Sequence, residues 1–235
     1  MGRPMKRRAT SGSPRHIRPT REAEKAFWQR GMALVAGLDE AGRGPWAGPV
    51  CAAAVVLPHE RADLVCLEEV RDSKTLSPRR RERLYDEIHA EALAVGWAFA
   101  AAEEIDALGI VPATRLAMRR ALDALEVSPQ ALILDAITLP DVDLPQNAFP
   151  RADARCLAVA AAGIVAKVTR DRWMVEHADV HFPGYGFARH KGYGTRQHQE
   201  ALDRLGVCPL HRRSFSPVAL RLERAAHVPP GERAL

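Results

Sequence analysis

The sequence predicts an α/β domain in which five short strands alternate with helices and are followed by further helices. Three observations favour this class. Short apolar, β-branched runs are bounded by Gly and Pro, segments with helical periodicity lie between them, and acidic residues follow several of the runs. With 235 residues, 47% of them hydrophobic, the chain is long enough to form one large domain with a buried core.

Five apolar runs are expected to form the strands. They cover residues 33–38, 50–57, 95–101, 131–134 and 148–152. Asp39 and Asp135 directly follow the first and fourth runs, and Asp153 follows the fifth. Because α/β sheets place their chemistry at strand ends, these acids mark the candidate site.

Helix signals lie between and after these runs. Ser77 followed by Pro78 is typical of a helix start, and Pro112 is expected to open a second helix. A long helix is expected over residues 157–178 and another over residues 195–205, where a glycine follows.

The positive charge is concentrated at the beginning of the chain. The net charge is +5, yet residues 1–30 hold nine Lys or Arg against two acids, so the remainder is slightly acidic. We expect residues 1–30 to be a disordered basic arm, residues 31–220 to be the folded domain and residues 221–235 to be a tail. The arm fits either attraction to a polyanion or a purely solubilising role.

Cysteine spacing and hydropathy predict a cytoplasmic protein without a membrane partner. The four cysteines are far apart and form no CxxC pair, so reduced thiols are expected rather than a disulfide or zinc framework. No apolar run reaches the length of a membrane-spanning helix, and the N-terminus lacks the apolar core of a secretory signal.

Four carboxylates form the candidate metal site. Asp39, Glu40, Asp135 and Asp153 can converge if the first and fourth strands are neighbours. Clustered carboxylates repel one another, so such a group is stable mainly around a cation, and oxygen ligands favour Mg²⁺ or Mn²⁺. Two such ions are a standard device for attack at a phosphodiester. The alternative is that these acids are helix caps and solvent-facing loop residues.

Two glycine-rich segments suggest contact with nucleic acid. Gly42, Arg43 and Gly44 form a loop beside the first acids, where glycine allows close backbone approach and arginine can contact a phosphate. Residues 183–195 interleave aromatics with glycines and cations, which suits stacking on sugars or bases. Ordinary turns remain the alternative for both. The nine histidines lack metal-ligand spacing, and we expect most to be surface or hydrogen-bonded residues.

Several motifs, in order, resemble the bacterial ribonuclease HII family over about residues 34–219. They are AGLDEAGRGPWAGPV, DSKTLS, LILDA, AAAGIVAKVTRDRWM, YGFARHKGYGT and HRRSFSPV. The resemblance implies a ribonuclease H-like fold, with a mixed five-stranded sheet flanked by helices and a C-terminal helical extension. It also implies a metal-dependent endoribonuclease that hydrolyses the RNA strand of RNA–DNA hybrids. Such an enzyme also cuts 5′ to ribonucleotides embedded in duplex DNA, leaving 3′-hydroxyl and 5′-phosphate ends.

The resemblance also implies roles for individual residues. By their positions in the motifs, the catalytic and metal-binding residues, for two Mg²⁺ or Mn²⁺ ions, are Asp39, Glu40, Asp135 and Asp153. The implied substrate contacts are Gly42, Arg43 and Gly44 at the ribose 2′-OH, Tyr193 at the RNA-to-DNA junction, and Lys74 and Lys191 at phosphates.

The chain departs from the family pattern at a few positions. Ala136 replaces a glycine after Asp135, Ala152 replaces a glycine before Asp153, and Gly163 stands where a serine is usual. Residues 109–111 also differ from the usual Asn-Ile. None of these changes removes a carboxylate.

Three alternatives remain open from the sequence. The chain could be a ribonuclease HIII-like nuclease, a resolvase-like nuclease of the same fold, or a hybrid-binding module without activity. The expected partners are RNA–DNA hybrids and ribonucleotide-containing duplex DNA. Nothing in the sequence demands a dimer, so a monomer is expected.

Overall fold

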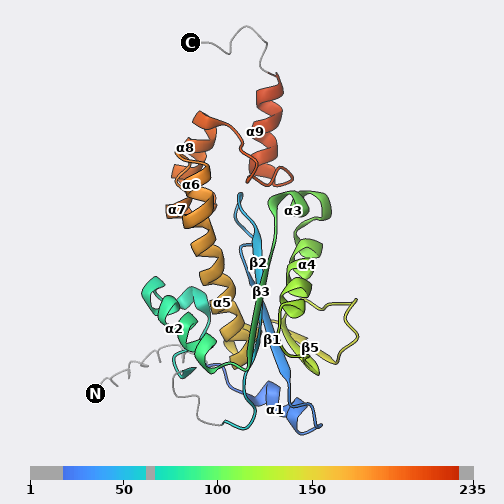
Figure 1. Ribbon diagram of the computed structural model, residues 1–235. Helices are drawn as coiled ribbons and strands as arrows, with labels where there is room; N and C mark the ends of the chain where they lie inside the picture. Colours follow the sequence, from blue (N-terminus) through green and yellow to red (C-terminus); the bar gives the residue numbers. More distant parts are fainter. Residues whose placement is uncertain (1–17, 62–66, 228–235) are drawn as a thin grey trace, which may run out of the picture.

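A mixed five-stranded sheet forms the centre of the computed structural model, which describes residues 18–61 and 67–227 (Figure 1). The strand order is β3-β2-β1-β4-β5. β1 pairs antiparallel with β2 and parallel with β4, while β3 and β5 form the two edges. The strands are β1 (Val35–Ala41), β2 (Val50–Val56), β3 (Ala94–Ala100), β4 (Ala131–Asp135) and β5 (Gln146–Phe149). The predicted α/β class with a mixed five-stranded sheet is confirmed.

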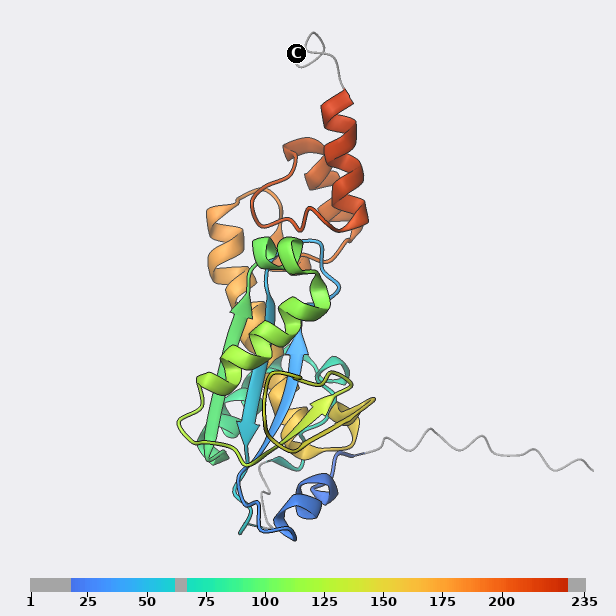
Figure 2. The same ribbon diagram turned by 90° about the vertical axis from the view of Figure 1, so that its right-hand side faces the viewer.

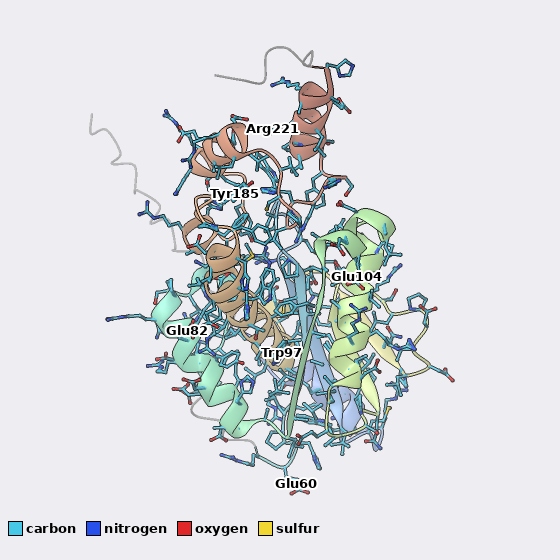
Figure 3. The ribbon with its side chains drawn as sticks, turned by 45° about the horizontal axis from the view of Figure 1, so that its top comes forward. Glu60, Glu82, Trp97, Glu104, Tyr185 and Arg221 are labelled. Atoms are coloured by element: carbon cyan, nitrogen blue, oxygen red, sulfur yellow. The ribbon has the colours of Figure 1, made fainter. Side chains whose placement is uncertain are left out.

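Helices cover both faces of this sheet (Figures 1 and 2). The helices of one face are α2 (Pro78–Glu91) and α5 (Leu157–Trp173), and those of the other are α3 (Ala102–Leu108) and α4 (Ile110–Asp123). In Figure 3, Glu82 of α2 and Glu104 of α3 lie on opposite sides of Trp97 in β3. Strand β2 is buried at every position, because both faces of the sheet are covered.

The contact between β1 and α5 is unusually close. Alternate residues of β1 face opposite layers, and Gly37 faces α5. A Cβ atom on Gly37 would lie 2.3 Å from the carbonyl carbon of Ala158, so only glycine permits this approach. The facing part of α5, from Ala158 to Gly163, is made of Ala, Val and Gly, which keep the helix surface flat.

A helical extension stands beyond one end of the sheet (Figure 1). Helix α5 continues through a π-helical turn into the short helix α6, and three further helices follow. These elements are the π turn Met174–Ala178, α6 (Asp179–His181), α7 (Phe187–His190), α8 (Arg196–Leu205) and α9 (Ser216–His227). The predicted C-terminal extension is therefore present, and the predicted helix over 157–178 changes to wider π geometry after Trp173.

Strand limits differ from the sequence prediction in two places. The first strand does not end at residue 38 but includes Asp39 and Glu40, because β2 pairs with it through Ala41. The fifth strand is Gln146–Phe149 rather than 148–152, and Ala152–Ala154 forms a 3₁₀ turn.

The predicted disordered arm over residues 1–30 is wrong for residues 22–28. They form α1 (Glu22–Trp28), which buries Phe27 in the core. Glu24 is also buried, and its Oε1 accepts a hydrogen bond from the Ala158 amide at 3.2 Å. This carboxylate therefore caps the positive N-terminal end of α5, whose own N-cap side chain makes no such bond. Residues 1–17 lie outside the described residues.

The predicted tail over residues 221–235 begins too early, because α9 continues to His227 and buries Val218. Residues 228–235 lie outside the described residues. No helix in the described part of the chain is long and apolar enough to cross a membrane. Cys51, Cys156 and Cys208 are free thiols, as predicted, and Cys66 is not among the described residues.

Buried histidines hold the helical extension together. The Cys208 amide donates to Nδ1 of His211 at 3.0 Å, so His211 carries its proton on Nε2. That proton faces Nε2 of His198 at 3.0 Å, and the Nδ1–H of His198 then donates to the Tyr193 carbonyl at 3.0 Å. This relay requires both rings to be neutral, and burial lowers the pKa of each to about 4.

We predict that this relay makes stability depend on pH. The unfolded histidines bind protons near pH 6.5, whereas the folded ones do so only near pH 4. The free energy of unfolding should therefore fall by about 1–2 kcal/mol per histidine as the pH is lowered from 7 to 5. Urea denaturation at pH 7 and pH 5 should show this loss, and His198→Gln should reduce it. His89→Gln, at an exposed site, is the control. An unchanged pH slope in His198→Gln would contradict the relay.

We also predict that Glu24 stabilises the protein through the N-terminus of α5. Glu24→Ala should lower the free energy of unfolding by about 1–2 kcal/mol, because it removes a helix cap. Urea denaturation at pH 7 measures the change. Glu22→Ala is the matched control, since this residue lies in the same helix but is exposed and forms a surface ion pair with Lys25. Equal stability of the two variants would show that Glu24 is not a cap.

Candidate active site

The strand pairing places two of the predicted acids side by side. Leu38 of β1 lies opposite Leu134 of β4, so the following residues, Asp39 and Asp135, reach the same edge of the parallel pair. Asp153 lies in the 3₁₀ turn just before α5 and is buried like Asp39. The Ala152 amide donates to Oδ1 of Asp135 at 3.0 Å, which ties this turn to the end of β4.

The carboxylates are close enough to affect one another. Burial, followed by repulsion from Glu40, Asp135 and Asp153, holds the pKa of Asp39 well above its usual range. Burial also raises the pKa of Glu40, although Arg43 opposes the shift. The structure therefore brings the four predicted acids into one electrostatic group.

Two cations partly balance this negative charge. Nη1 of Arg43 lies 3.2 Å from Oε1 of Glu40. Burial alone would lower the pKa of Lys74, but the carboxylates around it outweigh burial and raise that pKa. Lys74 is thus placed at the acids, at the start of the chain segment that leads into α2.

Asp72 is an acid that the sequence reasoning did not assign to the site. Burial and then the charge of Asp72 are the main causes that raise the pKa of Asp153. Oδ1 of Asp72 also accepts a hydrogen bond from the Lys74 amide at 2.9 Å, which shapes the turn that carries Lys74. The position of Asp72 in the DSKTLS motif, two residues before Lys74, was the feature of the sequence that could have identified it.

The acids are not gathered into a ready-made ligand set: within residues 18–61 and 67–227, no three acidic, His or Cys side chains form one. Neighbouring residues of a strand project to opposite faces, which separates Asp39 from Glu40. Asp39 and Asp135 each also accept a backbone hydrogen bond. The donors nevertheless fit a hard cation, because all are carboxylate oxygens and Oε2 of Glu40 is buried without a hydrogen-bond partner.

The departures from the family pattern can now be placed. A Cβ on Gly163 would lie 2.3 Å from Oδ2 of Asp39, so this glycine makes room for Asp39 rather than acting on Asp153. Ala136 has φ 58°, which costs about 1–2 kcal/mol for a residue with a side chain and explains the usual glycine. Ala152 is fully buried and its amide is used, so its methyl group is accommodated.

The glycine loop lies directly after β1. Gly42 has φ 94°, and a Cβ there would lie 2.0 Å from Nε of Arg170, so its glycine is required by packing. A Cβ on Gly44 would meet no atom within 4 Å, and this residue is exposed. Packing therefore requires a glycine at position 42. Gly44, in contrast, faces open space.

Tyr193 lies beside this loop. The Trp46 amide donates to the Gly192 carbonyl at 2.8 Å, and Gly194 packs against the Trp46 ring. Tyr193 is 42% exposed, and Nζ of Lys167 lies 5.7 Å from its ring centroid. The structure thus brings the two glycine-rich segments together.

The ammonium group of Lys191 is engaged within the protein and is not free to contact a phosphate. Its Nζ donates to the Ala188 carbonyl, and burial lowers its pKa. The sequence reasoning also missed Arg170 and Arg212, which are fully buried beneath the glycine loop. Both lie in the motifs quoted above, but nothing in a sequence distinguishes a buried arginine from an exposed one.

Comparison with known proteins agrees with this geometry. The model of the family "Ribonuclease HII" matches residues 36–218. The ribonuclease HII of Chloroflexus aurantiacus is 55% identical over 203 residues, which cover 85% of this chain and 94% of the relative.

Solved structures show the same fold. Ribonuclease H2 from Pyrococcus horikoshii has a TM-score of 0.71 at 28% identity, covering 83% of this chain and 100% of the other. The ribonuclease HIII Bst-RNase HIII, solved in complex with Mn²⁺, has a TM-score of 0.62 at 21% identity, covering 85% and 72%. The ribonuclease H-like fold is thereby confirmed. From the matched family model and the relative's identity over most of both chains, the chain belongs to the ribonuclease HII family of enzymes.

Proposed function

We propose that this protein is a divalent-metal-dependent endoribonuclease that hydrolyses the RNA strand of RNA–DNA hybrids. We further propose that it cuts 5′ to a ribonucleotide embedded in duplex DNA and leaves 3′-hydroxyl and 5′-phosphate ends. The observation that carries the proposal is the position of four interacting carboxylates directly beside a glycine loop with an open face. Chemistry on a phosphodiester and inspection of the neighbouring sugar can then occur at one place.

The residues that would hold the metal are Asp39, Glu40, Asp135 and Asp153. Their oxygens suit Mg²⁺ and Mn²⁺ equally, and the related ribonuclease HIII solved with Mn²⁺ supports a divalent ion of this kind. When bound, such ions supply an activated water and stabilise the leaving oxygen. Burial of Asp39 limits how far water can screen the attraction between its carboxylate and a metal ion. Gly163 leaves room for this carboxylate.

The glycine loop supplies groups that can test for a 2′-OH. The amides of Arg43 and Gly44 donate to no acceptor in the described part of the chain. A site built to hydrogen-bond a hydroxyl rejects a substrate that lacks it, because its polar groups are then left unpaired. The exposed Tyr193 ring lies beside this loop and provides a surface on which the next sugar can pack.

The remaining parts of the proposal concern charge and assembly. We propose that Lys74, which lies among the acids, contacts a phosphate there, and that Lys191 does so only after it releases the Ala188 carbonyl. We propose a monomer, because one chain provides the carboxylates, the glycine loop and Tyr193. Free thiols fit a cytoplasmic location.

We predict that Asp39→Asn removes activity without unfolding the protein. Losing the central carboxylate weakens the metal site, so cleavage of a duplex with one ribonucleotide should fall by about a thousandfold or more in Mg²⁺. Binding of the same duplex should change little. The control is Asp123→Asn, which lies at the exposed end of α4. Full activity of Asp39→Asn would reject the proposed site.

We predict that the two loop glycines respond differently to alanine. Gly44→Ala should leave the free energy of unfolding within about 0.5 kcal/mol of the original, because its Cβ meets nothing in the free protein. The same change should lower kcat/KM for the embedded ribonucleotide by about tenfold or more, because the methyl group blocks the sugar. Gly42→Ala should instead destabilise the fold. Thermal melting and cleavage assays measure both effects, and normal activity of Gly44→Ala would contradict close approach of the sugar.

A further inference from the structure

Two buried arginines lie under the proposed recognition loop. Arg170 comes from α5, Arg212 comes from the segment between α8 and α9, and both side chains are fully buried. In the described part of the chain, neither forms an ion pair with an acidic side chain. Burying two cations without a carboxylate partner is costly, so these residues need a specific reason to be arginine.

Within the described residues, every hydrogen bond of the two guanidinium groups goes to a backbone carbonyl. The acceptors of Arg212 and their distances are Gly42 (2.6 Å), Arg43 (2.9 Å) and Gly48 (2.9 Å). The acceptors of Arg170 and their distances are Pro49 (2.7 Å), Ala47 (3.1 Å) and Lys191 (3.1 Å). Six carbonyls from two loops are thus held by two planar forks.

This arrangement sets the direction of the recognition amides. In a trans peptide the C=O of one residue and the N–H of the next point in opposite directions. Because the carbonyls of Gly42 and Arg43 point inward to Arg212, the amides of Arg43 and Gly44 must point outward. These are the two amides that have no acceptor in the described part of the chain.

The same pair also fixes the distance between the loops. Arg170 binds the first loop through Ala47 and Pro49 and the second loop through Lys191, two residues before Tyr193. The Arg212 amide adds a bond to the Trp46 carbonyl at 2.8 Å. Gly192 packs so tightly on Ala47 that a Cβ would lie 2.3 Å from its carbonyl oxygen.

We propose that Arg170 and Arg212 are positioning residues for ribonucleotide recognition, holding the outward amides of the glycine loop at a fixed spacing from Tyr193. This inference rests on the proposed function, because it concerns the specificity of the same site. Neither side chain touches the substrate. Lysine cannot replace them, since an ammonium group lacks the planar fork that reaches three carbonyls at once.

The test measures discrimination rather than activity alone. Arg212→Lys keeps the charge but not the fork. With wild-type protein as reference, kcat and KM are measured on a duplex with one ribonucleotide. Affinity is measured for that duplex and its all-DNA twin in Ca²⁺. We expect kcat/KM to fall by about ten- to a hundredfold and the ribonucleotide to lose its binding advantage. Affinity for the all-DNA duplex should stay within about twofold.

The matched control is Arg120→Lys. Arg120 lies in α4 on the other face of the sheet, where it bonds both the Phe99 carbonyl and Glu104. It should keep both specificity and rate. If Arg212→Lys is folded and still prefers the ribonucleotide duplex as strongly as wild type, the positioning role is wrong. If wild type itself does not cleave that duplex, the proposed function fails instead.

A measurement on the wild-type protein covers the case in which Arg212→Lys does not fold. The Nε–H protons of Arg170 and Arg212 donate to buried carbonyls, so NMR should show them protected from solvent exchange at neutral pH. The Arg120 guanidinium, which is partly exposed, should exchange fast. Rapid exchange at Arg170 and Arg212 would overturn the proposal without any variant.

Discussion

The close contact between β1 and α5 is the constraint on which the rest of the structure depends. Gly37 lets the helix backbone approach the strand, and Gly163, about one and a half turns beyond Ala158 on α5, leaves room for the carboxylate of Asp39. A side chain at position 163 would displace the carboxylate of Asp39, and one at position 37 would push α5 away from the sheet. Since Asp153 lies just before α5, the same displacement would separate Asp153 from the acids of β1 and β4. The small residues of α5 therefore determine the site as well as the core.

Helix α5 also connects the acids to the recognition loops. Gly163, Lys167 and Arg170 follow one another at intervals of four and three residues, so they lie on one stripe of the helix. The first contacts Asp39, the second lies under the Tyr193 ring, and the third holds the carbonyls of both loops. A rigid helix suits this arrangement, because it sets one spacing between the proposed metal ligands and the proposed sugar contacts.

The sequence predicted the parts of this structure that follow from local patterns. Apolar runs located all five strands, and acids at their ends located Asp39, Asp135 and Asp153. Strand pairing was harder to predict: β1 continues past Leu38 to Ala41 because β2 pairs with it there, and no local signal in the sequence shows this. Residues 22–28 looked like part of a charged arm because Glu24 reads as a surface residue, whereas its partner is the distant Ala158 amide. Arg170 and Arg212 were missed for the same reason, since their partners are backbone atoms far away in sequence.

Charge balance explains why the free protein tolerates its own active site. Repulsion among four carboxylates would destabilise the end of the sheet. Arg43, which pairs with Glu40, and Lys74, which lies among the acids, reduce this repulsion. Lys74 stands where we propose that a substrate phosphate arrives, so a bound phosphate would give it an anionic partner while a metal ion would neutralise the carboxylates. Beneath the glycine loop, the buried cations Arg170 and Arg212 donate their hydrogen bonds to backbone carbonyls instead of to carboxylates in the described part of the chain. The glycine loop therefore has acids beside it and buried cations beneath it, and the outward amides that we propose for recognition are supported by this buried positive charge.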